Sequence, residues 1–133
     1  MSGYVLIGGA IASYLIATLI KNLIAIAKHE FSIKNVFSSG GMPSSHTATV
    51  ATLCALVFLV DGPTISFAIS FIFLCIVMTD AIGVRRKAGF IAEAVNKNLK
   101  TELPTRIGHS KTEVAVGFFL GVILSIFWAA LFL

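Results

Sequence analysis

Four long apolar segments, separated by short polar stretches, constrain this chain more than any other feature. They run from Gly3 to about Ala27, from Thr47 to Val60, from Thr64 to about Thr79, and from Val114 to Leu133. A bilayer core about 30 Å thick is crossed by about 20 helical residues, and the first and last segments reach that length unaided. The sequence therefore predicts an all-α membrane protein.

The composition supports this prediction. Hydrophobic residues make up 57% of the 133 residues and charged residues 12%, against about 45–50% and about 25% in an ordinary soluble domain. The formal net charge of +4 is carried by a lipid-embedded chain, in which basic groups face anionic headgroups or cytoplasm. We therefore expect the lipid bilayer as a partner and no nucleic acid.

The two middle segments reach spanning length only if polar residues are included at their ends. The second helix must begin near Pro43, and the third must continue through Asp80 to about Val84. The turn at Asp61-Gly62-Pro63 makes these helices an antiparallel hairpin. Between 85 and 111, apolar residues recur at helical spacing within a polar region, which predicts a short amphipathic helix lying at the interface. We predict a single transmembrane domain, 1–133, in which an up-down bundle of about four transmembrane helices (about 3–27, 43–60, 64–84 and 110–133) is joined by an interfacial helix (about 88–100).

This threading gathers the basic residues on one side of the membrane. All ten belong to the helix ends and loops of that side: Lys21, Lys28, Lys34, Arg85, Arg86, Lys87, Lys97, Lys100, Arg106 and Lys111. Cytoplasmic segments are enriched in Lys and Arg, so we expect this side to be cytoplasmic and both termini to face outward. We expect no transit peptide before the first helix, which favours a multi-pass protein of a bacterial plasma membrane.

The start of the second helix carries residues suited to phosphate chemistry. Ser44 or Ser45 is a good N-cap, and a helix start offers unpaired backbone N–H groups and the positive end of the helix dipole. Such a start is an anion cradle. His46, in the first turn, is placed to give a proton to a leaving oxygen. The alternative is a capped helix with an interfacial histidine.

The start of the fourth predicted transmembrane helix carries a second histidine. His109 and Glu113 are four residues apart and share a helical face. A carboxylate there can hold one imidazole nitrogen and leave the other free to attack. The same spacing also occurs in ordinary helix pairs, but a second histidine at a second helix start on the same membrane side favours a site.

The remaining candidates are charged residues at the other helix ends. Arg85 and Arg86 close the third helix and point in different directions, and the sequence leaves open which of them binds phosphate oxygens. Lys21 and Lys28 lie two turns apart on one face, as phosphate ligands or as anchors that snorkel to the headgroups. Asp80 either pairs with a cation or ligates a metal, although no second carboxylate cluster accompanies it.

Three motifs in order resemble a known family. Pro43-Ser44-Ser45-His46 followed by His109-x-x-x-Glu113 resembles the type 2 phosphatidic acid phosphatase superfamily. The fuller set, Gly-Gly-Met-Pro-Ser-Ser-His, Asp-Ala-x-Gly-Val-Arg-Arg-x-Ala-Gly and Gly-His-x-x-x-Glu-Val, resembles its small divergent branch, which is related to acid phosphatases and vanadium haloperoxidases. The resemblance extends from about Lys21 to Gly121.

The resemblance implies a metal-independent lipid phosphate phosphatase without a cofactor. His109 would be the nucleophile that forms a phosphohistidine, Glu113 would orient it in place of the family Asp, and His46 would be the general acid. The implied phosphate-binding residues are Lys21, Lys28, Ser44, Ser45, Arg85 and Arg86, with Asp80 in support. Access from the cytoplasm favours phosphatidylglycerophosphate or phosphatidic acid as the substrate.

The chain departs from the family motifs at three positions. The lysine motif of the superfamily ends in Arg-Pro, whereas Lys28 stands there without a proline. The family arginine, six residues before the nucleophile, is Leu103 here, and Ser45 replaces a Gly. Two alternative functions stay open: a non-catalytic membrane protein that binds anionic lipids, and a small transporter subunit. A path through four helices is narrow, so a transporter would require a homo-oligomer.

Overall fold

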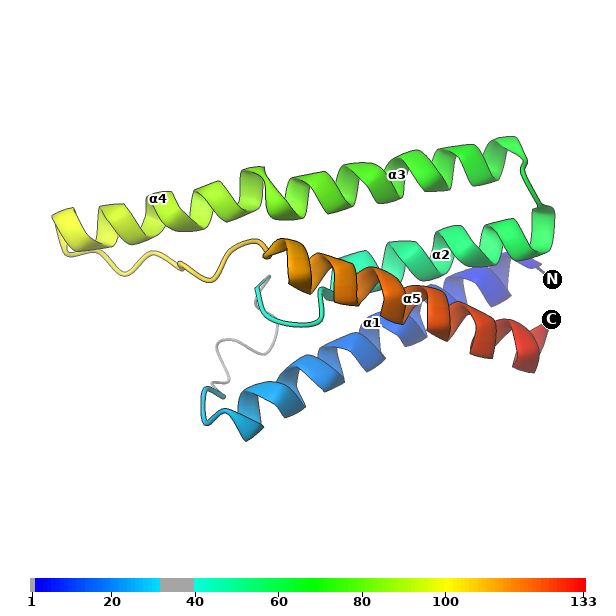
Figure 1. Cartoon of the computed structure of the whole chain (residues 1–133), viewed down its shortest axis with the longest axis horizontal. Helices are drawn as coiled ribbons and strands as arrows, with labels where there is room; N and C mark the ends of the chain where they lie inside the picture. The colour runs from blue at the N-terminus through cyan, green and yellow to red at the C-terminus, as the bar shows by residue number, and fades with distance from the viewer. Residues whose placement is uncertain (1, 32–39) are drawn as a thin grey trace.

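The described part of the chain folds into helices and the segments that connect them. The computed structural model describes residues 2–31 and 40–133, and within these ranges the elements are α1 (Ser2–Ala27), α2 (Ser45–Asp61), α3 (Ile65–Ile82), α4 (Val84–Leu99) and α5 (Lys111–Phe132). Both termini lie at one end of the molecule, and α1 ends and α2 and α5 begin toward the other (Figure 1). The all-α prediction is confirmed.

The helices have the lengths and surfaces of membrane spans. α1, α5 and the run formed by α3 and α4 are long and apolar enough to cross a bilayer, whereas α2 has 17 residues, or about 25 Å. Large apolar side chains cover the outside of the bundle, among them Ile11, Leu19, Ile69, Phe119 and Ile123. A contiguous apolar surface of this kind is stable in lipid and not in water. The protein is therefore a membrane protein, as predicted.

Helix α2 lies at the centre of the bundle and contacts α1, α3 and α5. Gly117 allows α5 to approach it closely, because a Cβ atom there would lie 2.6 Å from the carbonyl oxygen of Ser44. Thr52 adds a buried polar link, since its Oγ1 lies 2.9 Å from both Ser13 Oγ and the carbonyl oxygen of Gly121. Three helices are thus fixed to one another along the same central helix.

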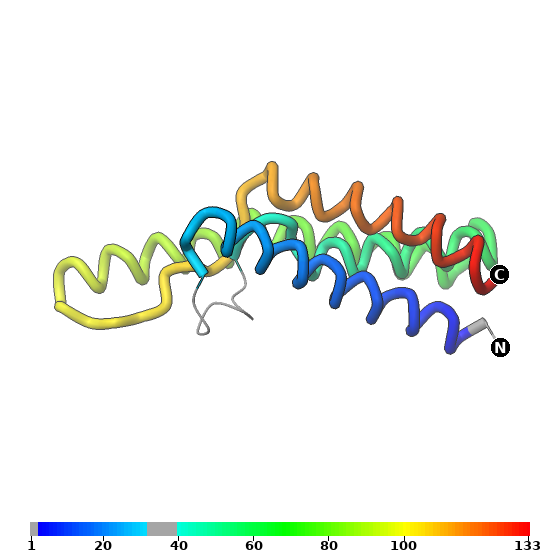
Figure 2. Tube along the Cα trace, turned by 90° about the horizontal axis from the view of Figure 1, so that it is seen from below, coloured from blue at the N-terminus to red at the C-terminus, as the bar shows by residue number. Residues whose placement is uncertain are grey.

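The direction of the amphipathic helix differs from the expectation. We expected it to lie across the membrane face, but α4 continues α3 away from the bundle in both views (Figures 1 and 2). The break between the two helices is a single residue, Gly83, whose N–H donates to the Thr79 carbonyl (2.9 Å) at the end of α3 and whose carbonyl accepts the N–H of Lys87 (3.0 Å) at the start of α4. The return segment, residues 100–110, is tied to α4 by Asn96, whose side chain hydrogen-bonds both the N–H and the carbonyl oxygen of Leu103.

The described basic residues belong to the end of the bundle where α1 ends and α5 begins, or to α4 and the return segment. Lys34, which the threading argument also assigned to this side, lies outside the described residues. The start of α5 lies beside the end of α3, where the N–H of His109 donates to the carbonyl of Ala81, whereas α1 diverges from the other helices toward its end (Figure 1).

Candidate active site

His109 is held rigidly between the return segment and α5. Its N–H donates to the carbonyl of Ala81 on α3 (2.9 Å), and its side chain is only 4% exposed. The preceding Gly108 has φ +78°, and a Cβ atom there would lie 2.3 Å from the backbone nitrogen of Arg86. Only glycine fits this close approach in this backbone conformation. Gly108 therefore lets the return segment press against the start of α4 and set the position of the histidine.

Glu113 orients the His109 ring. Nδ1 of His109 lies 3.2 Å from Oε2 of Glu113, and because a carboxylate only accepts, Nδ1 carries the proton and Nε2 keeps its lone pair. The same Oε2 accepts the N–H of Ser110 (2.9 Å), while Ser110 Oγ accepts the N–H of Glu113 (3.2 Å). This capping box begins α5. The helix cap thus fixes the carboxylate that positions the imidazole.

The surroundings of His109 favour its neutral form. Burial lowers the pKa of His109 below its ordinary value of 6.5, and the charges of Lys21 and His46 act in the same direction. The hydrogen bond and charge of Glu113 oppose this shift and are outweighed. A neutral imidazole with an unprotonated Nε2 is the form that attacks an electrophile.

His46 faces the same cavity as His109. It lies in the first turn of α2, it is exposed, and the edge of the Tyr14 ring packs near it with 6.1 Å between ring centroids. A cavity of about 360 Å³ is lined by both histidines, two charged residues and five apolar ones, namely His46, His109, Asp80, Arg85, Val50, Phe73, Ile76, Val77 and Ala81. The two helix starts singled out by the sequence therefore meet at one place.

The two arginines after α3 take different positions. Arg85 lines the histidine cavity, and its Nε donates to Oδ2 of Asp80 in an ion pair. The guanidinium of Arg86 lies 5.6 Å from the centroid of the Phe90 ring and lines a neighbouring cavity of about 420 Å³, which His109 also borders. Asp80 thus pairs with a cation. Among the described residues, no three His, Cys, Asp or Glu side chains gather closely enough to hold a metal ion.

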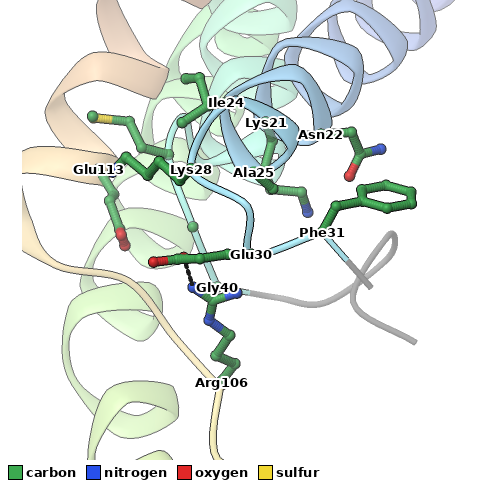
Figure 3. Close-up of a pocket in the computed structure, with 12 residues that line it drawn as sticks. Lys21, Asn22, Ile24, Ala25, Lys28, Glu30, Phe31, Gly40, Arg106 and Glu113 are labelled. Atoms are coloured by element: carbon green, nitrogen blue, oxygen red, sulfur yellow. Dashed lines mark hydrogen bonds and ion pairs between the residues drawn. The ribbon is translucent and has the colours of Figure 1, made fainter. Parts of the chain in front are cut away.

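The two lysines line a cavity on another side of Glu113. Lys21, only 9% exposed, and Lys28 line a third cavity, of about 150 Å³, together with Arg106 and Glu113 (Figure 3). Arg106 was not among the residues that the sequence singled out. The sequence feature that could have identified it is its position three residues before His109, in the segment that leads to α5.

Ser44 and Ser45 build the start of α2 instead of lining these cavities. Ser44 donates its N–H to the carbonyl of Glu113 (3.1 Å), and its Oγ accepts the N–H of Thr47 (3.4 Å). The hydroxyl of Ser45 accepts a hydrogen bond from Thr18 on α1 (3.2 Å). Ser44 therefore joins α2 to α5. Because its N–H is used in this bond, it cannot donate to the anion expected at the start of α2.

Together these features define an all-helical membrane protein with a buried histidine–glutamate pair and a second histidine facing one cavity at the basic end of the bundle. The chain belongs to the Divergent PAP2 family, whose sequence pattern matches residues 3–124. It is also similar to the "Uncharacterized membrane protein YuiD" of Bacillus subtilis (strain 168), at 34% identity over 93% of each chain. No solved structure matches it. The resemblance inferred from the motifs is confirmed.

Proposed function

We propose that this protein is a membrane lipid phosphate phosphatase that hydrolyses a phosphomonoester through a phosphohistidine. One observation carries the proposal: His109, buried and held by Glu113, lines the same cavity as His46 from another helix start. A nucleophile with an orienting carboxylate and a separate proton donor are the groups that this reaction requires. The Divergent PAP2 family supports the proposal at the level of the superfamily.

In the first step, Nε2 of His109 attacks phosphorus while the bond from phosphorus to the lipid oxygen breaks. Protonated His46 gives its proton to that leaving oxygen, and the dephosphorylated lipid departs as an alcohol. In the second step, a water molecule gives a proton to His46 and attacks phosphorus. The phosphorus–nitrogen bond then breaks, inorganic phosphate leaves, and both histidines return to their starting forms.

Charged residues around the cavity stabilise the transferring group. The phosphoryl oxygens carry the developing charge, and Arg85, held by Asp80, lies beside the histidines to meet it. Lys21 adds positive charge from the far side of Glu113. The carboxylate of Glu113 stabilises the imidazolium that forms when His109 is phosphorylated.

The walls of the histidine cavity suit a lipid. Phe73, Ile76 and Val77 of α3 lie beside its polar end, and the first two are half exposed on the outside of the bundle. A substrate with a phosphate and an apolar chain satisfies both parts of such a site. If the basic end faces the cytoplasm, as the distribution of Lys and Arg favours, the substrate is an intermediate such as phosphatidylglycerophosphate or phosphatidic acid.

Phosphate release by detergent-purified protein from a panel of lipid phosphates tests the proposal. We expect His109→Ala to abolish release and His46→Ala to reduce it by about 10²–10⁴-fold. His29→Gly is the matched control, because His29 has φ 57°, a conformation that glycine adopts freely, and should leave the rate unchanged. Equal rates in all variants would refute the site, and binding of lipid phosphate without turnover would favour the non-catalytic alternative.

A further inference from the structure

The cavity between α1 and the return segment is crossed by an ion pair. Nη2 of Arg106 lies 2.7 Å from Oε2 of Glu30, and the side chains are 51% and 53% exposed (Figure 3). Among the residues that the structure describes, three cations line this cavity: Lys21, Lys28 and Arg106. Of the two described acidic residues that line it, Glu113 is engaged by His109 and Ser110. Glu30 is thus the acidic residue that meets Arg106.

The end of α1 sets the position of Glu30. The N–H of Glu30 donates to the carbonyl of Ala25 (2.9 Å), and that of His29 to the carbonyl of Ile26 (3.0 Å). His29 has φ 57°. These two bonds and the left-handed residue between them form a Schellman motif, which closes a helix with a defined backbone path. The carboxylate of Glu30 is therefore presented from an ordered turn.

Arg106 also lies on an ordered segment, and the backbone connects it directly to the proposed nucleophile, His109. It lies three residues before His109 on the return segment, which His109 anchors to Ala81. Arg106 lines the lysine cavity and also the neighbouring cavity that His109 and Glu113 border. A guanidinium here can reach an anion between the lysines and the histidine.

We propose that Arg106 is a phosphate-binding residue and that Glu30 is its internal competitor, holding the guanidinium in the empty site and giving it up when phosphate binds. The proposal rests on the proposed function for the identity of the ligand. A carboxylate and a phosphate present similar pairs of oxygens to guanidinium, so they exclude each other from it. Because the ion pair is half exposed, its disruption costs little, and an anion with more charge displaces Glu30.

Binding of inorganic phosphate to detergent-purified protein, followed by calorimetry, tests this exchange without turnover. We expect Glu30→Gln to tighten binding by about twofold to fivefold, the range that an exposed ion pair contributes. We expect Arg106→Gln to weaken it by about tenfold or more. In the double variant, the gain from Glu30→Gln should disappear, since no guanidinium is left to be released.

Glu102→Gln is the matched control. It removes the same charge from the exposed return segment at a residue that lines none of the three cavities. Tighter binding in Glu30→Gln alone would support the exchange. Equal effects of Glu30→Gln and Glu102→Gln, or no effect of Glu30→Gln, would overturn it. Turnover is measured separately. Hydrolysis of lipid phosphate without tighter phosphate binding in Glu30→Gln would refute only the exchange on Arg106. Tighter binding in Glu30→Gln without hydrolysis would refute only the proposed phosphatase activity.

Discussion

Replacing Glu113 with Gln separates its two roles, which are to cap α5 and to place a negative charge beside the His109 imidazole. Its Oε2 accepts hydrogen bonds from Nδ1 of His109 (3.2 Å) and from the N–H of Ser110 (2.9 Å). A Gln oxygen can accept both, and Gln also occurs at this position of capping boxes. The substitution therefore keeps the start of α5 and removes the negative charge beside the imidazole.

The loss in rate follows from that charge. Phosphorylation of Nε2 makes the ring of His109 positive, and a hydrogen bond to a charged group contributes about 1.5–3 kcal/mol. At an effective dielectric constant of about 20, two unit charges about 4 Å apart attract by about 4 kcal/mol. Glu113 is 26% exposed, so solvent screens part of this attraction. We expect kcat to fall roughly 10- to 10³-fold in Glu113→Gln.

The assay compares phosphate release with thermal unfolding in the same detergent. Glu113→Gln should lose rate and keep its unfolding temperature, whereas Glu113→Ala should lose both, because removing the capping oxygen costs about 1 kcal/mol. Glu113→Asp, which restores the family residue, should retain more activity than Glu113→Gln. Full activity in Glu113→Gln would show that the negative charge beside the imidazole does not contribute to the rate, and a lowered unfolding temperature in that variant would show that the cap is disrupted and accounts for the loss of rate.

Three further outcomes are expected. Burial lowers the pKa of His109 below 6.5, so the nucleophile stays neutral as the pH falls through 6.5. In the pH profile of kcat/KM, the loss of activity on the acid side should therefore occur below pH 6.5, and a loss above that pH would contradict the site. Activity should survive a metal chelator and be inhibited by vanadate, which a requirement for added metal would contradict. Gly117→Ala should lower thermal stability by about 1–3 kcal/mol, because its Cβ atom would meet the Ser44 carbonyl at 2.6 Å; unchanged unfolding would contradict this close packing.

Most of the fold could be predicted because the helices are set by local physics. Hydropathy marks the spans, and the turn at Gly62 separates α2 from α3. The direction of α4 could not be predicted, because its amphipathic pattern is the same whether the helix lies flat or extends α3. That direction is set by Gly83, the single residue that ends α3 and begins α4, and by the return segment, which Asn96 holds against α4.

The site was predictable where its residues form local motifs. His109 and Glu113 are four residues apart, and this spacing predicted their contact, although His109 lies just before the N-cap Ser110 and meets Glu113 through the capping box instead of within the helix. The pair of Glu30 and Arg106 joins positions 76 residues apart in two connecting segments, and no sequence pattern fixes such a contact. Likewise, the hydrogen bond from the Ser44 N–H to the Glu113 carbonyl depends on how closely α5 packs on α2.

Trapping the covalent intermediate is the most direct test of whether His109 attacks the phosphate of the substrate. Detergent-purified protein would be mixed with lipid phosphate carrying labelled phosphorus, quenched in alkali within the first turnover, and mapped by peptide. We predict label on His109 that is stable in alkali and labile in acid, present in His29→Gly and absent in His109→Ala. Label that persists in His109→Ala, or phosphate release by the wild type with no label on His109 at any time, would contradict the account.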